Sequence, residues 1–72
     1  MNEYTQEQLT RICGILKSIG LQKEQIFGIM SMLETEEMAT ELVEKIAEKN
    51  FNLTPQETMN LFAQIVKKHK VL

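Results

Sequence analysis

The chain has 72 residues, of which 43% are hydrophobic and 25% charged, proportions that argue against a disordered protein. Its net charge of −2 at pH 7 lacks the positive excess that supplies most of the affinity of nucleic-acid-binding domains. A single cysteine excludes an internal disulfide, and the polar start "MNEYTQEQ" lacks the features of a signal peptide. No apolar stretch has the length of a membrane span. We therefore expect one cytoplasmic domain over residues 1–72, with no membrane association.

The first predicted helix covers about residues 5–19. Its start, "TQEQ", fits a capping box with Thr5 as the N-cap. Gly20 suits the left-handed conformation that ends many helices, and Leu21 would then pack back on Leu16 as in a Schellman motif. Apolar residues recur at steps of three and four, which aligns them on one face. These residues are Leu9, Ile12, Cys13, Leu16 and Ile19.

Two further helices are predicted over about residues 22–33 and 35–49. Thr35 is the expected N-cap of the third helix, and Glu36 and Glu37 lie in its first turn, where negative charge is favourable. The inward residues are Ile26, Ile29, Met30 and Leu33 in the second helix, and Ala39, Leu42, Val43 and Ile46 in the third.

The end of the third helix repeats the pattern of the first. Asn50 tolerates the left-handed conformation, and we expect Phe51 to reach back to Ile46. A fourth helix over about residues 54–69 then has the clearest start in the chain, "LTPQE". Thr54 is the N-cap, the proline occupies the first helical position, and the glutamate completes a capping box.

No segment alternates with a period of two, so the sequence predicts an all-α fold, a compact bundle of four short helices without disulfides or metal. Landmarks of the two halves lie 30 to 32 positions apart. This spacing fits two stacked helical hairpins. It fits equally well a chance recurrence of the residue types that usually start and end helices. The expected core consists of Leu9, Ile12, Leu16, Ile19, Ile26, Ile29, Met30, Leu33, Leu42, Ile46, Leu61, Phe62 and Ile65.

The helix over residues 22–33 has no charged side chain in its second half. On a helical wheel, Phe27 and Met32 flank the side opposite the core stripe, with Gly28 and Ser31 between them. A helix that is apolar all round can be buried on several sides by its neighbours. Alternatively, these four residues form a partner-binding surface, for another protein or for a second copy in a homodimer. Small residues let a backbone approach, and Phe and Met supply adaptable apolar area.

The remaining polar residues do not form a pattern that predicts catalysis. A metal site needs several ligands, and a nucleophile needs a base and a polar cleft. His69 is expected at the frayed or capped end of the last helix, and Cys13 as a small buried hydrophobe. The acidic residues within 34–48 are expected to form a solvated face or a docking patch. We expect Glu41 to pair with Lys45, and Glu44 or Glu48 to lie near Lys45 and Lys49. We therefore expect a non-enzymatic protein with no catalytic residue, cofactor, metal or small-molecule substrate.

The stretch "LKSIGLQKEQIFGIMSML" resembles the first hairpin of ubiquitin-associated domains, in which a Met-Gly-Phe type turn precedes a short helix. Here the turn is Ile19-Gly20-Leu21. The resemblance implies a compact helical interaction module. Because Leu21 replaces the partner-binding aromatic of that family and the chain continues into a fourth helix, ubiquitin binding is not implied.

The same stretch is similar to helix-turn-helix DNA-binding motifs, with "SIGL" as the turn and residues 23–33 as the recognition helix. The second half of that helix offers only Ser31 to base edges. The fourth helix offers Gln56, Asn60 and Gln64, followed by the basic segment "KKHK". The sequence favours a small protein–protein interaction module or adaptor. The alternative is a nucleic-acid-binding regulator that uses the fourth helix and the basic C-terminus, although the charge balance makes nucleic acid the less expected partner.

Overall fold

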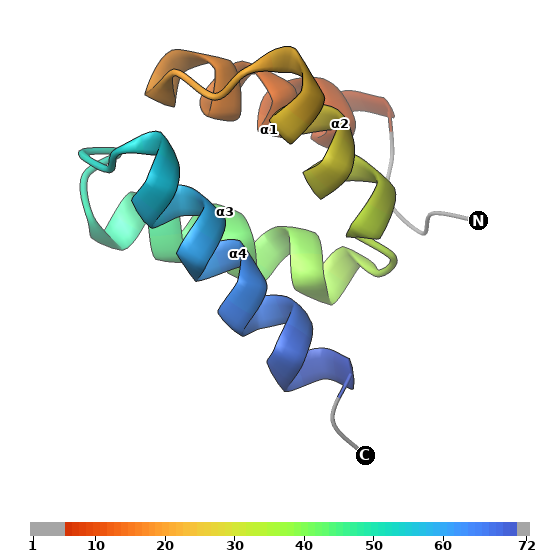
Figure 1. Cartoon of the computed structure of the whole chain (residues 1–72). Helices are drawn as coiled ribbons and strands as arrows, with labels where there is room; N and C mark the ends of the chain where they lie inside the picture. The colour runs from red at the N-terminus through yellow and green to blue at the C-terminus, as the bar shows by residue number, and fades with distance from the viewer. Residues whose placement is uncertain (1–5, 71–72) are drawn as a thin grey trace.

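The computed structural model describes residues 6–70 and shows four helices joined by short turns. They are α1 (Gln6–Ile19), α2 (Lys23–Met32), α3 (Glu36–Glu48) and α4 (Pro55–Lys70). α1 packs mainly against α2, and α3 against α4. The two resulting hairpins are stacked on each other (Figure 1). The described part of the chain contains no strand, which confirms the all-α, four-helix prediction.

α2, α3 and α4 start one residue later than expected because the predicted ranges included their N-terminal capping residues. Thr35 Oγ1 accepts a hydrogen bond from the Met38 N–H at 3.2 Å and caps α3. At the start of α4, the Thr54 N–H donates to Glu57 Oε1 at 2.8 Å, and the Glu57 N–H donates to Thr54 Oγ1 at 3.1 Å. Both predicted caps are therefore confirmed. The predicted capping by Thr5 lies outside the described residues.

The turn between α1 and α2 has the expected Schellman geometry. Gly20 has a φ of 108°, and the Leu21 N–H donates to the Leu16 carbonyl at 3.2 Å. Leu21 is only 6% exposed and belongs to the same buried cluster as Leu16, although the expected core did not include it. The next helix begins at once, with the Gln22 N–H donating to Gln25 Oε1 at 2.8 Å.

The turn between α3 and α4 differs from the expected geometry at one residue. Asn50 is left-handed with a φ of 55°, and the Phe51 N–H donates to the Ile46 carbonyl at 3.1 Å, as in the first hairpin. However, Phe51 is also left-handed, with a φ of 58°, and its side chain is 52% exposed. The Phe51 backbone therefore reaches back to Ile46 as expected, while its side chain stays half-exposed. The second left-handed residue turns the chain once more, and Leu53 packs against the core instead.

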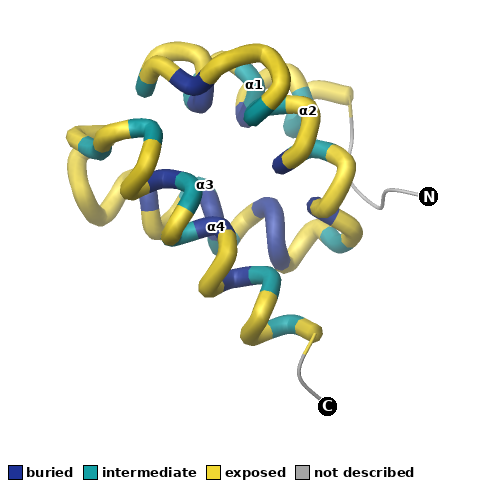
Figure 2. Tube along the Cα trace, viewed as in Figure 1, coloured by how far each residue is buried: buried dark blue, intermediate teal, exposed yellow. Residues whose placement is uncertain are grey.

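The core lies between the two hairpins, on the sides that face each other (Figure 2). Most residues of the expected core are buried, and Leu9, Ile19, Ile26, Met30 and Leu61 are partly buried against it. Thr58 is fully buried, and its hydroxyl donates to the Thr54 carbonyl at 3.0 Å, so it leaves no unpaired polar atom. The buried hydrophobic residues are Ile12, Leu16, Leu21, Ile29, Leu33, Met38, Ala39, Leu42, Ile46, Phe62 and Ile65.

None of the helices within residues 6–70 combines the length and the apolar character needed to cross a membrane.

Candidate functional site

The outer side of α2 is not covered by the other helices. Its inner side is fixed by Ile29, which is fully buried, while Phe27 is 63% exposed and Met32 is 45% exposed. Gly28 and Ser31 are exposed as well. The interpretation that α2 is buried on several sides is therefore wrong. All four residues of the expected contact surface lie at the surface, and we refer to Phe27, Gly28, Ser31 and Met32 as the α2 face.

The α2 face is arranged in two adjacent rows. Phe27 and Ser31 are four residues apart, as are Gly28 and Met32, so each pair follows the helix axis. The Ser31 hydroxyl donates to the Gly28 carbonyl at 2.9 Å. This bond satisfies the hydroxyl within its own helix, and the two small residues lie between the phenyl ring of Phe27 and the thioether of Met32 on the helix surface.

The row of Phe27 and Ser31 borders a groove between α1 and α2. Ile26 and Met30 contribute to it from α2, together with residues of α1. Cys13 is only partly buried and lines the groove, although the sequence predicted it inside the core. The complete lining consists of Gln6, Leu9, Thr10, Cys13, Ile26, Phe27, Met30 and Ser31. The structure thus extends the α2 face with an apolar groove floor that the linear sequence did not indicate.

Gly28 is not required by the fold of the single chain. A Cβ atom built on Gly28 meets no atom within 4 Å, and the same is true of Gly14 in α1. By contrast, Gly20 has a positive φ, which alanine rarely adopts. Glycine inside a helix costs about 0.5–1 kcal/mol relative to alanine. At position 28 this cost is not offset by any close contact or backbone conformation within the described chain that requires glycine.

Charged residues are distributed unevenly along α2. Lys23 lies at its N-terminal end, and its Nζ is 5.8 Å from the centroid of the Phe27 ring, a cation–π contact. After the C-cap Leu33 the chain continues with Glu34, and Glu36 and Glu37 open α3. The N-terminal end of α2 therefore carries one positive and one negative side chain, Lys23 and Glu24, and glutamates follow its C-terminal end.

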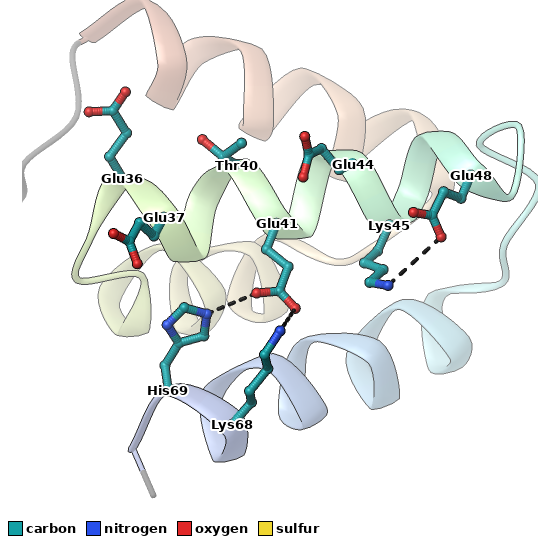
Figure 3. A pocket seen from close by; sticks show the side chains of 9 residues that line it. All are labelled: Glu36, Glu37, Thr40, Glu41, Glu44, Lys45, Glu48, Lys68 and His69. Carbon is teal, nitrogen blue, oxygen red and sulfur yellow. Dashed lines mark hydrogen bonds and ion pairs between the residues drawn. The ribbon is translucent and has the colours of Figure 1, made fainter. Parts of the chain in front are cut away.

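A second hollow lies over α3 and the end of α4 and is lined mainly by glutamates (Figure 3). Glu41 Oε1 is 2.9 Å from His69 Nε2, and Glu41 Oε2 is 3.1 Å from Lys68 Nζ. These hydrogen bonds, first from His69 and then from Lys68, hold the pKa of the Glu41 carboxyl below its usual value. Lys45 lies 3.9 Å from Glu48, which confirms one of the expected pairs, whereas the expected pairing of Glu41 with Lys45 is wrong because Glu41 binds His69 and Lys68. His69 is held against α3 rather than frayed.

The glutamates around this hollow do not build a metal site. No group of three His, Cys, Asp or Glu side chains within residues 6–70 is arranged to hold a metal ion. The exposed carboxylates of α3 point outward from successive turns in Figure 3, which fits a solvated helix face.

The basic C-terminal segment is largely paired within the chain. Lys68 binds Glu41, and Lys70 forms an ion pair with Glu34. The hydrogen bond and the charge of Lys70 lower the pKa of the Glu34 carboxyl. On α4, the Gln56 side-chain amide donates to the Asn60 side chain at 3.0 Å. Several of the groups that a nucleic acid would use, Lys68, Lys70, Gln56 and Asn60, are therefore engaged with their own neighbours.

No protein-family model, curated protein or solved structure matches this chain. The candidate site consequently rests on the geometry and chemistry of the α2 face and the adjoining groove.

Proposed function

We propose that this protein is a small, non-enzymatic, cytoplasmic interaction module that binds a protein partner through the α2 face and the α1/α2 groove. The observation that supports this proposal is the 63% exposure of Phe27, beside an apolar groove, on a helix whose opposite side is anchored in the core. An exposed apolar surface of this kind marks interaction sites in small proteins.

The energy available at Phe27 is large enough to matter for binding. A phenylalanine side chain has about 150–250 Å² of surface, so the exposed part amounts to roughly 100–150 Å². At about 25 cal/mol per Å², covering it contributes roughly 2–4 kcal/mol. A contribution of this size is typical of the few residues that dominate an interface. The partly exposed floor of the groove adds apolar area around this anchor.

Site-specific photocrosslinking in the native host tests this proposal. A benzoylphenylalanine residue replaces Phe27, and a matched variant carries it at Gln64, an exposed position on α4. We expect a discrete protein adduct from position 27 and none of the same mass from position 64. The absence of an adduct at position 27, or identical adducts at both positions, would contradict the proposal.

The nucleic-acid alternative receives less support because Lys68 and Lys70 are already paired with Glu41 and Glu34. On this basis, we expect no salt-dependent binding of duplex DNA by the purified chain, measured by fluorescence anisotropy at low ionic strength.

A further inference from the structure

We propose that the last turn of α4, residues 67–70, is a pH-sensitive latch that is held on α3 by the Glu41 carboxylate and loosens when either Glu41 or His69 loses its charge. This inference goes beyond the proposed function, because the latch lies on α3 and α4 and involves neither the α2 face nor the α1/α2 groove.

The apolar anchoring of α4 ends before its last turn. Phe62 and Ile65 are buried, and Val66 is packed at the edge of the core. Within residues 67–70 the three lysines are exposed, and only His69 is partly buried. The last turn therefore lacks the apolar contacts that hold the rest of the helix. Helix ends of this kind open locally at a small cost in free energy.

Polar contacts hold the last turn instead. The two oxygens of Glu41 on α3 bind two neighbouring residues of α4, His69 Nε2 at 2.9 Å and Lys68 Nζ at 3.1 Å (Figure 3). Lys70 forms an ion pair with Glu34, in the turn before α3. The side chains of Glu41 and His69 are 19% and 22% exposed, whereas that of Lys68 is 69% exposed. Among these contacts, the one between Glu41 and His69 is thus the best shielded from water and salt.

The contacts at Glu41 require a charged carboxylate. Hydrogen bonds from His69 and then from Lys68 lower the pKa of the Glu41 carboxyl. A lowered pKa in the folded state means that the contacts are fully present above the unfolded value of about 4.5 and are lost as the pH falls through the lower folded value. The Lys70 contact weakens in the same direction, because its hydrogen bond and charge lower the pKa of Glu34 as well. Acid therefore opens the latch.

The contact between Glu41 and His69 also depends on the charge of the imidazole ring. Histidine is the side-chain type that ordinarily changes its charge between about pH 5 and 8, and His69 is the only histidine of the chain. A neutral ring can still donate a hydrogen bond from Nε2, but the ion pair and the favourable positive charge at the helix C-terminus are lost.

The other charged groups around His69 do not duplicate this response. Those that line the same hollow are carboxylates and ammonium groups, namely Glu36, Glu37, Glu44, Lys45, Glu48 and Lys68. Rising pH therefore loosens the latch from the other side, and the latch is tightest in mildly acidic solution. Opening frees the Glu41 carboxylate and the basic side chains of residues 67–70, while the buried part of α4 stays in place.

The Cα chemical shifts of residues 67–70 test the proposal, because they report the helical population of each residue. They are measured by NMR on the purified full chain between about pH 3.5 and 9, a range that covers both titrations. We expect the helical shift to be largest at about pH 5–6 and to decrease on both sides. Each lost ion pair should raise the ratio of open to closed last turn by about 1.5- to 5-fold, as is typical of exposed pairs. The shifts of Leu42 and Ile46 in the core of α3 should stay constant.

Three variants separate the two sides of this profile. Glu41→Gln should loosen the last turn in mildly acidic solution and reduce both responses, leaving the acid response of Glu34. His69→Gln should remove the response above about pH 6 and keep the acid response, because Lys68 still binds Glu41. Glu44→Gln is the matched control. It removes an exposed carboxylate from the same hollow without removing an ion pair of the described chain, so its profile should follow that of the unchanged protein.

Each of three results would overturn the latch. The first is a helical shift of the last turn that does not change with pH, or that changes in Glu41→Gln as it does in the unchanged protein. The second is an equal effect of Glu44→Gln and Glu41→Gln, because the charge of the whole hollow rather than one carboxylate would then control the turn. The third is a loss of the helical shifts of Leu42 and Ile46 together with those of residues 67–70, because the end of α4 would then open only with the whole fold.

Discussion

The three glycines of this chain should respond to alanine in opposite directions. Gly14→Ala and Gly28→Ala place a methyl group in open space on a helix surface, whereas Gly20→Ala forces a side chain into a backbone with a φ of 108°. The methyl at position 20 would meet the Pro55 Cγ at an acceptable 3.7 Å, so the penalty there comes from the backbone rather than from a clash.

The magnitudes follow from these local environments. Each of the two helical substitutions should raise the free energy of unfolding by about 0.5–1 kcal/mol, because alanine restricts the unfolded chain and favours the helix. For a domain of this size, that corresponds to an increase in Tm of roughly 2–8 °C. Gly20→Ala should lower the free energy of unfolding by about 1–2 kcal/mol, the cost of left-handed backbone for a residue with a Cβ.

Thermal unfolding followed by circular dichroism at about 5 µM, a concentration that disfavours weak self-association, measures all three variants. Urea titration provides the free energies independently, and an unchanged m-value verifies that only stability has changed. Destabilisation by Gly28→Ala at this concentration would refute the reasoning, because it would show that glycine is needed within the single chain. A neutral Gly20→Ala would refute the assigned turn geometry.

Three further predictions concern other parts of the molecule. Replacing Thr54 with alanine removes the capping box of α4 and should cost about 1 kcal/mol in a urea titration, while an unaffected midpoint would contradict the cap. The lowered pKa of Glu41 stabilises the fold above the unfolded pKa of about 4.5, and this contribution is lost as the pH falls through the lower folded value. Glu41→Gln should therefore flatten the acid dependence of stability, and an unchanged pH profile would count against the ion pairs seen at this residue. Phe27→Glu combined with Met32→Glu should leave the helical circular dichroism unchanged because both side chains are exposed, whereas Ile29→Glu, a charge in the core, should unfold the domain. Loss of helicity in the double variant would show that the α2 face is structural.

Features that depend on four or five consecutive residues could be predicted from the sequence. The capping box at Thr54 and the left-handed end at Gly20 are decided by hydrogen bonds within one turn, so their residue types are sufficient. The Phe51 turn shows the limit of such rules. Only Asn50 was expected to be left-handed. Phe51 is left-handed as well, which changes the direction of its side chain, and no residue pattern in the sequence indicates this second left-handed position.

Features that depend on how the two hairpins pack against each other could not be predicted from short sequence patterns. His69 and Glu41 are 28 positions apart, and their contact requires α4 to lie against α3 at a particular height. The sequence placed Phe27 away from the core stripe, but its exposure depends on where the other three helices lie. Cys13 likewise belongs to the apolar stripe of α1, which is continuous in the sequence. The position of α2 beside this stripe leaves a groove there, and Cys13 lines it.

The pairing of α1 with α2 and of α3 with α4 also determines how this chain reaches its fold. The closest packing joins helices that follow each other in sequence, so little loop-closure entropy opposes the first contacts. Helical proteins with such local contacts fold in microseconds to milliseconds, which leaves an exposed apolar surface little time to aggregate before the core closes. The ion pair between Glu34 and Lys70 joins the turn before α3 to the end of α4, and it can form only after α4 has packed along α3 up to its last turn. It would therefore slow unfolding more than it speeds folding.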